Sequence, residues 1–165
     1  MSTVLNTNGD SLKIPSLHKR TTGKFYVVTA DWNSDITTPL RDGAIEVLRE
    51  AGVDDSKIKK ISVPGTVELV NAAAICMHRG DTAAVIAIGC VIRGDTPHFD
   101  YVCNIVSHGI ANLNSEGKAP VIFGVLTVNN LQQAQQRAGG ILGNKGAEAA
   151  VAALEMANLH STFWL

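Results

Sequence analysis

The sequence lacks an excess of charge of either sign. Its 165 residues include 14 lysines and arginines and 15 aspartates and glutamates, so the formal net charge is −1 when the histidines are neutral. A surface without a basic excess exerts no long-range attraction on nucleic acid or on anionic lipid. The composition therefore argues against nucleic-acid-binding and membrane-surface proteins.

Long hydrophobic runs and paired cysteines are missing as well. No apolar stretch of the sequence approaches the roughly 20 residues of a membrane-spanning helix. The polar segment from Met1 to Lys13 has no apolar centre of the kind found in secretory signal peptides. The three cysteines, Cys76, Cys90 and Cys103, have neither the even number nor the spacing of a disulfide framework. We therefore expect a single domain located in the reducing cytoplasm.

Common ligand-binding motifs are also absent. The glycines form neither the GxGxxG pattern of dinucleotide-binding folds nor the GxxxxGK[ST] pattern of phosphate-binding loops. No set of histidines, cysteines and aspartates has the spacing of metal ligands. The cysteines are not expected to be nucleophiles, because the sequence pairs none of them with a histidine.

What the sequence does contain is a regular alternation of apolar runs and helical patterns. β-branched and aromatic residues predict four strands, at 25–29, 60–63, 83–88 and 119–126. Apolar residues at helical spacing predict five helices, which begin near residues 36, 66, 99, 131 and 145. We predict a single three-layer αβα domain with a four-stranded parallel sheet of the flavodoxin-like type, over residues 23–165. A flexible extension, residues 1–22, precedes it.

Polar side chains follow all four predicted strands. Ligands bind at the carboxyl ends of the strands in open parallel sheets. The candidates at these ends are Asp31 to Asn33, Gly65 to Glu68, Gly89 to Asp100, and Leu126-Thr127. We expect the four segments to converge on one site.

The stretch from Gly89 to Asp100 carries the densest set of reactive side chains. We expect the preceding strand to end at Ile88 and Gly89 to allow a sharp turn. Thr96 would then be the N-cap of a helix and Pro97 its first residue. Backbone N–H groups at such a helix start favour an anion.

Histidines and arginines near these segments have two readings each. His98 would be the natural proton carrier at neutral pH, but a polar residue in an exposed first turn is an equally good reading of the local sequence. Arg93 and Arg137 could each bind an anion, although Arg137 is also placed to pair with the carbonyls of a helix end. His78 and His108 are more simply structural.

Two side chains at the strand ends are ambiguous, and a third aromatic residue lies inside a strand. Trp32 could stack on a planar ring or fill the core. Glu68 lies in the first turn of a helix capped by Thr66, where acidic residues are favoured in any case. Phe123 lies inside a strand and is expected in the core. From these residues alone, the chain is an α/β enzyme or binding protein for a small anionic ligand.

Five segments taken together resemble the lumazine synthase family. They are Val63 to Glu68 (VPGTVE), Gly89 to Asn104 (GCVIRGDTPHFDYVCN), Phe123 to Thr127, Gln133 to Gly139, and Gly143 to Ala150. The resemblance extends in order from about residue 23 to 160. It implies condensation of 5-amino-6-(D-ribitylamino)uracil with 3,4-dihydroxy-2-butanone 4-phosphate to 6,7-dimethyl-8-ribityllumazine, the penultimate step of riboflavin biosynthesis. It also implies that no metal or organic cofactor is needed.

The resemblance assigns roles to individual residues. His98 would be the catalytic proton donor and acceptor. The butanone phosphate would be bound by Asp95, Thr96 and Arg137. The pyrimidine and its ribityl chain would be bound by Trp32, Thr66, Val67, Glu68, Cys90, Val91, Ile92, Phe123 and Lys145. Arg137 and Lys145 would come from the neighbouring subunit, which makes the site interfacial.

The resemblance further implies a homo-oligomer, either a pentamer or a hollow shell of sixty subunits, with riboflavin synthase as a further partner. The segment from Ala147 to Ala157 is apolar nearly all round, which fits either an alanine-rich helix or one buried by a neighbouring subunit. Two positions depart from the family pattern, Ile141-Leu142 in place of Lys-Ala and Cys90 in place of Thr. The competing hypotheses are a catalytically weak flavin- or lumazine-binding shell protein and an unrelated FMN-binding or phosphosugar-isomerising domain.

Overall fold

A four-stranded parallel sheet forms the centre of the computed structural model, which describes residues 12–163. The strand order is β2-β1-β3-β4. The strands are β1 (Lys24–Ala30), β2 (Ile58–Val63), β3 (Thr82–Ile92) and β4 (Val121–Val128). This order, with β1 and β3 side by side in the middle, is that of doubly wound flavodoxin-like sheets. The predicted fold class is confirmed.

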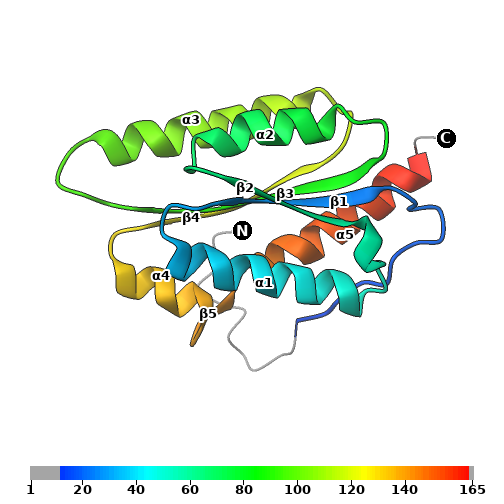
Figure 1. Ribbon diagram of the computed structural model, residues 1–165, viewed down its shortest axis with the longest axis horizontal. Coiled ribbons are helices and arrows are strands. Elements are labelled where there is room, and N and C mark those ends of the chain that lie inside the picture. Colours follow the sequence, from blue (N-terminus) through cyan, green and yellow to red (C-terminus); the bar gives the residue numbers. More distant parts are fainter. Residues whose placement is uncertain (1–11, 164–165) are drawn as a thin grey trace.

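Helices cover both faces of the sheet (Figure 1). On one face lie α1 (Ser34–Glu50) and α5 (Lys145–Phe163), and on the other lie α2 (Glu68–Met77) and α3 (His98–Ser115). The short helix α4 (Leu131–Arg137) and the 3-10 turn η1 (Asp55–Lys57) complete the helical part. The result is the expected three-layer sandwich.

The two central strands are apolar on both faces, because each face is covered by helices. In β1, Phe25 and Val27 belong to the core beneath α1 and α5, whereas Tyr26 and Val28 belong to the core beneath α2 and α3. Strand β3 alternates in the same way, and residues 84–90 of it are buried. This double burial explains why the sequence of a central parallel strand shows no polar alternation.

Helix α5 packs very closely on α1. A side chain at Gly146 would collide with the backbone carbonyl of Leu40 in α1. The small residues Ala149 and Ala153 of α5 are buried in the same core, and Ala149 lies close to Gly124 of β4. The opposite face of α5 exposes Met156 and Leu159, so the helix is covered on one side within this chain.

The N-terminal segment is described from Leu12 onward. Residues 12–23 contain no helix or strand, as expected, but they are attached to the domain. Leu12, Ile14 and Leu17 pack against the core beneath α1 and α5. His18 donates its backbone N–H to Asn158 at 2.8 Å. The rest of the predicted extension, residues 1–11, lies outside the described residues.

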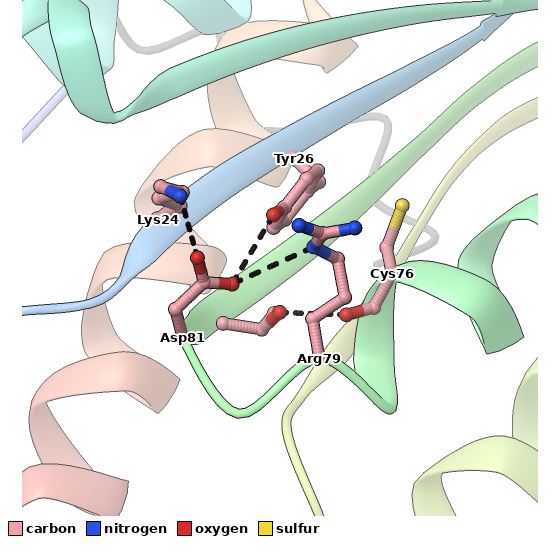
Figure 2. A network of polar contacts seen from close by, with 6 residues as sticks. Lys24, Tyr26, Cys76, Arg79 and Asp81 are labelled. Atoms are coloured by element: carbon pink, nitrogen blue, oxygen red, sulfur yellow. Dashed lines mark hydrogen bonds and ion pairs between the residues drawn. The ribbon is translucent and has the colours of Figure 1, made fainter.

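A cluster of polar contacts holds the amino ends of β1 and β3 together (Figure 2). The Asp81 carboxylate accepts hydrogen bonds from Lys24 Nζ at 2.5 Å and from the Tyr26 hydroxyl at 3.3 Å, and Arg79 Nε lies 3.7 Å away. The hydrogen bond from Lys24 is the largest of the effects that lower the pKa of Asp81. These contacts lie at the edge of the sheet opposite the carboxyl ends.

Strand β3 is longer than predicted, and this changes the role of Gly89. The strand continues to Ile92 because residues 89–92 stay paired with β4, Gly89 opposite Val125 and Ile92 opposite Val128. Gly89 is therefore a strand residue and not a turn. A side chain there would come within 3.0 Å of Leu69 and Thr66 in the adjacent segment, so glycine permits a close approach.

The predicted caps are also wrong. Helix α2 begins with Val67 as its N-cap, and helix α3 begins with Pro97, and neither has a side-chain capping hydrogen bond. Thr66 is buried instead of capping the helix, and its side chain lies against Gly89. An antiparallel hairpin of β5 (Ala138–Gly140) and β6 (Gly143–Asn144), which the sequence did not predict, connects α4 to α5.

Candidate active site at the carboxyl ends of the strands

Two cavities are lined by the residues to which the resemblance assigned roles, with the exception of Asp95. The first, which we call the histidine cavity, measures about 490 Å³ and lies at the carboxyl ends of β1, β2 and β3. The second, which we call the arginine cavity, measures about 600 Å³ and follows the outer strand β4. The histidine cavity is lined by Trp32, Asn33, Gly65, Thr66, Val67, Glu68, Cys90, Val91, Ile92, Gly94, Thr96, His98, Phe99 and Val102. The arginine cavity is lined by Asn114, residues 120–128, Arg137, Lys145 and Met156.

Trp32 is presented to solvent by the turn that follows β1. Its backbone N–H donates to the carbonyl of Pro64 at 3.2 Å, which ties the turn to the end of β2. The side chain is 72% exposed, so it does not fill the core, and that alternative is wrong. An indole held by its backbone and open on its faces is suited to stacking on a planar ring.

Asn33 is a site residue that the sequence argument did not single out as a side chain. It has a positive φ of 60°, a conformation in which asparagine is better tolerated than most residues. Its Nδ2 donates to the carbonyl of Cys90 at 2.9 Å, which joins the turn after β1 to the end of β3. Asparagine directly before a helical pattern was the available signal.

The segment between β2 and α2 supplies the next part of the wall. Thr66 is buried and Val67 half-buried, while Glu68 is exposed in the first turn of α2. The first N–H groups of a helix have no intrahelical acceptor, so this turn offers donors as well as a carboxylate. A flexible polar chain, such as a polyol, could be held by these groups.

The end of β3 contributes backbone and apolar surface. Cys90 is buried, and burial raises the pKa of its thiol to about 11. The thiol therefore stays protonated at neutral pH, in agreement with the prediction that Cys90 is no nucleophile. Val91 and Ile92 are half-buried and complete this wall of the cavity.

The turn between β3 and α3 carries the titratable group. His98 is the first residue of α3, is exposed, and lines the histidine cavity together with Thr96. An imidazole in this position can reach both solvent and a bound ligand, which a proton carrier needs. Asp95 is exposed as well, but it is not among the residues that line the cavity.

The arginine cavity contains the remaining predicted site residues. Phe123 is 37% exposed on β4, so the expectation that it is a core residue is wrong. Arg137 ends α4 and donates from Nη1 to the carbonyl of Gln133 at 3.0 Å. Lys145 pairs with Glu148 at 2.8 Å, with side-chain exposures of 16% and 14%.

The two cavities have no lining residue in common. Three of the four strand ends converge on the histidine cavity as predicted, but Leu126-Thr127 lines the arginine cavity. Within one chain, the structure therefore separates His98 and Trp32 from Phe123 and Arg137. Neither cavity alone holds all the groups that the sequence assigned to one site.

The described part of the chain has neither a cluster of metal ligands nor a membrane-spanning helix. Between residues 12 and 163, no three or more side chains of His, Cys, Asp or Glu are grouped so that they could hold a metal ion. None of the helices in that range combines the length and the apolar character needed to cross a membrane.

Fold and site define an α/β protein with a cavity at the carboxyl ends of the strands, lined by an aromatic ring, a carboxylate and an imidazole. A family model described as 6,7-dimethyl-8-ribityllumazine synthase matches residues 22–161. The chain therefore belongs to the 6,7-dimethyl-8-ribityllumazine synthase family, and it is an enzyme of that family.

Individual relatives carry the same name. The 6,7-dimethyl-8-ribityllumazine synthase of Porphyromonas gingivalis is 56% identical over 133 residues, 81% of this chain and 83% of that protein. That of Phocaeicola vulgatus is 53% identical over 133 residues, 81% of this chain and 79% of that protein. That of Cytophaga hutchinsonii is 49% identical over 152 residues, 92% of this chain and 93% of that protein.

Proposed function

We propose that the chain condenses 5-amino-6-(D-ribitylamino)uracil with 3,4-dihydroxy-2-butanone 4-phosphate to give 6,7-dimethyl-8-ribityllumazine, the penultimate step of riboflavin biosynthesis, without a cofactor and in the cytoplasm. The observation that carries this proposal is the histidine cavity. It brings together Trp32, Glu68, Thr96 and His98 from three different strand ends. Family membership supplies the reaction, and the cavity supplies groups suited to each of its steps.

The pyrimidine binds on the Trp32 side of the histidine cavity. The exposed indole stacks on the heterocycle, and the first turn of α2, with the Glu68 carboxylate, holds the ribityl hydroxyls. Backbone groups of Cys90 to Ile92 border the ring edge. Because the contacts of Cys90 are made by its backbone, cysteine in place of the family's common threonine has little effect.

The butanone phosphate binds at the turn before α3. Backbone N–H groups near Asp95 and Thr96, with the Thr96 hydroxyl, face the phosphate, and the helix start favours its negative charge. The Asp95 carboxylate is turned to solvent in this arrangement, since it would repel the phosphate.

His98 moves the protons. The amine of the pyrimidine attacks the ketone to form a carbinolamine, and His98 delivers a proton to the departing oxygen as water leaves and the imine forms. It then accepts the proton removed beside the imine while phosphate is eliminated, and ring closure releases the second water. Holding the two reactants together supplies much of the remaining acceleration.

The arginine cavity completes the site of a neighbouring subunit. Phe123, Arg137 and Lys145 lie together along β4, away from their own histidine cavity. In a ring, such as a pentamer, β4 of one subunit would face the histidine cavity of the next. Phe123 then covers the pyrimidine and Arg137 supplies charge to the phosphate. Assembly of pentamers into a sixty-subunit shell, and association with riboflavin synthase, are further parts of this proposal.

One position leaves the neighbouring half of the site less basic than in most of the family. Ile141, at the tip of the β5–β6 hairpin, is 80% exposed where a lysine is common. Arg137 and Lys145 then remain as the cations of this half-site, and Lys145 is already paired with Glu148. We therefore assign the phosphate charge to Arg137 alone.

The decisive experiment incubates the purified protein with both substrates and follows lumazine absorbance and fluorescence. Wild-type protein should form product, and His98→Ala should be slower by about 10²- to 10⁴-fold, the usual contribution of a positioned acid–base group. His108→Ala is the matched control, because His108 is an exposed histidine of the same helix outside both cavities. Absence of product with wild-type protein would refute the proposed function.

A further inference from the structure

Arg93 is the one strongly basic residue of the stretch before α3, and the proposed function gives it no role. It directly follows β3, and its backbone N–H donates to the carbonyl of Val128 at 2.9 Å. Its side chain makes three more contacts. Nη2 lies 3.1 Å from Asp100 Oδ1, Nε donates to Asn129 Oδ1 at 3.3 Å, and Cζ lies 4.1 Å from the centre of the Phe99 ring.

These contacts close the turn that carries the phosphate-binding backbone. The turn, Gly94 to Pro97, leaves β3 at Arg93 and enters α3 at His98. The guanidinium reaches over this turn to Phe99 and Asp100, both in the first turn of α3. Helix α3 has no side-chain N-cap hydrogen bond, so a cap does not fix the turn. The Arg93 side chain instead connects the start of the turn to the first residues of α3 directly.

The other end of this contact network is anchored in α4. The backbone N–H of Asn129 donates to Gln133 Oε1 at 2.8 Å, and the backbone N–H of Gln133 donates to Asn130 Oδ1 at 2.9 Å. Asn130 thus caps the start of α4, and the Gln133 side chain reaches back to the residue before the cap. Asn129, whose side-chain Oδ1 accepts from Arg93, is therefore itself held by a hydrogen bond to α4.

The same contacts make Arg93 a poor ligand for the substrate phosphate. Its charge is balanced by Asp100, one face of its guanidinium lies on a ring, and Nε is occupied. Arg93 is also not among the residues that line the histidine cavity. Its influence on the reaction must therefore pass through the residues that it holds.

We propose that Arg93 is a positioning residue. Through Asp100, Phe99 and Asn129 it holds the turn before α3 in the conformation that aims the Thr96 backbone at the phosphate and the His98 imidazole at the reacting atoms. This inference rests on the proposed function for its effect on catalysis. Its effect on the turn itself does not depend on which reaction the site performs.

The expected magnitude follows from the exposure of the contacts. An exposed ion pair and an exposed cation–π contact together change an equilibrium by about 3- to 30-fold. Arg93→Gln should therefore lower kcat/KM for the butanone phosphate by about that factor, while KM for the pyrimidine stays within about twofold. Arg93→Lys should recover part of the loss, because it keeps the charge but not the planar fork.

A double-mutant cycle separates positioning from a general loss of charge. Asp100→Asn removes only the ion pair and should lower kcat/KM by less than Arg93→Gln, which also loses the contacts with Phe99 and Asn129. The double variant should lower kcat/KM no further than Arg93→Gln alone, because the ion pair is already broken there. Arg49→Gln is the matched control, because Arg49 and Asp55 form a similar exposed ion pair at 2.7 Å and line neither cavity. Effects that multiply in the double variant, or a uniform loss that also raises KM for the pyrimidine, would contradict the proposal.

Hydrogen exchange tests the turn without reference to catalysis. The amides at the two ends of the turn, residues 93, 100 and 101, are hydrogen-bonded to Val128 and Pro97 and are therefore protected from exchange. They should exchange about 3- to 30-fold faster in Arg93→Gln than in wild-type protein, by a smaller factor in Asp100→Asn, and at the wild-type rate in Arg49→Gln. Unchanged exchange in both variants would overturn the positioning role, whatever the activity. If the variants exchange faster but the wild-type protein forms no lumazine, the positioning role of Arg93 stands and only the proposed function is refuted.

Discussion

Two inactive variants, His98→Ala and Arg137→Ala, should restore each other's activity when they are assembled into the same oligomers. The reason is geometric. His98 lines one cavity of the chain and Arg137 lines another, and the two cavities share no residue. If a working site combines the histidine cavity of one subunit with the arginine cavity of the next, a mixed ring contains contacts in which both halves are intact.

The size of the recovery follows from counting contacts. Each site combines the histidine cavity of one subunit with the arginine cavity of the next. In an equal mixture, the subunit that supplies the histidine cavity keeps His98 in half of the sites. The subunit that supplies the arginine cavity keeps Arg137 in half of the sites. About one quarter of the sites are then complete, because contacts in a head-to-tail ring are formed independently. The specific activity should approach about 25% of wild type, far above either parent.

The assay unfolds the two variants, mixes them, refolds them together and measures lumazine fluorescence per subunit. The matched control mixes wild-type protein with the double variant His98→Ala/Arg137→Ala. An interfacial site again predicts about one quarter of full activity, whereas a site within one chain predicts one half. Activity no higher than that of the separate parents in the first mixture, together with one half in the second, would refute an interfacial site.

Three smaller predictions concern single positions. Gly146→Ala should lower the free energy of unfolding by about 1–3 kcal/mol in urea denaturation, because the new methyl group collides with the backbone of α1; unchanged stability would contradict that contact. Because the hydrogen bond from Lys24 lowers the pKa of Asp81, its carboxylate stabilises the fold above the unfolded-state pKa of about 3.9 and less as pH falls through its lower folded pKa. Asp81→Asn should thus destabilise at pH 7, and its effect should shrink progressively as the pH falls below about 4. A difference independent of pH would exclude this linkage. Iodoacetamide at pH 8 should modify half-buried Cys103 before Cys90, whose pKa burial raises to about 11, as peptide mass mapping would check.

The sheet and its layers could be predicted from the sequence because burial on two faces leaves a simple pattern. Residues 84–88 are continuously apolar, and only a central parallel strand between two helical layers requires this. The end of β3 could not be predicted in the same way. Pairing with β4 continues through Val91 and Ile92, and backbone pairing to a distant segment leaves no local signal.

The failed caps have a related cause. Threonine before a helix is a good cap in isolation, but Thr66 is used for packing against Gly89, where two segments approach closely. Thr66 does not cap the helix because of its contact with Gly89, and the local sequence around Thr66 gives no sign of that contact. Gly89 was misread as a turn for the same reason, since a glycine chosen for close approach looks like one chosen for its conformation.

Half of the proposed site could be predicted from strand ends, because topology brings the ends of β1, β2 and β3 to one edge. The other half could not. Phe123 looked like a core residue because its strand is apolar, yet β4 is the outermost strand of the sheet and leaves the ring 37% exposed. Only the resemblance to a family assigned it to a ligand.

The two arginines differ in how their guanidinium groups are occupied. Arg93 lies beside the predicted anion-binding turn, but its guanidinium N–H groups already bind Asp100 and Asn129, and one face of the guanidinium lies on the Phe99 ring. Arg137 lies on another element, and within residues 12–163 no carboxylate pairs with it. A bidentate ligand for phosphate must keep its N–H groups available until the substrate arrives. Proximity along the chain favoured Arg93 as the anion ligand, whereas its occupied guanidinium supports the proposal that Arg137 binds the phosphate and that Arg93 shapes the turn before α3.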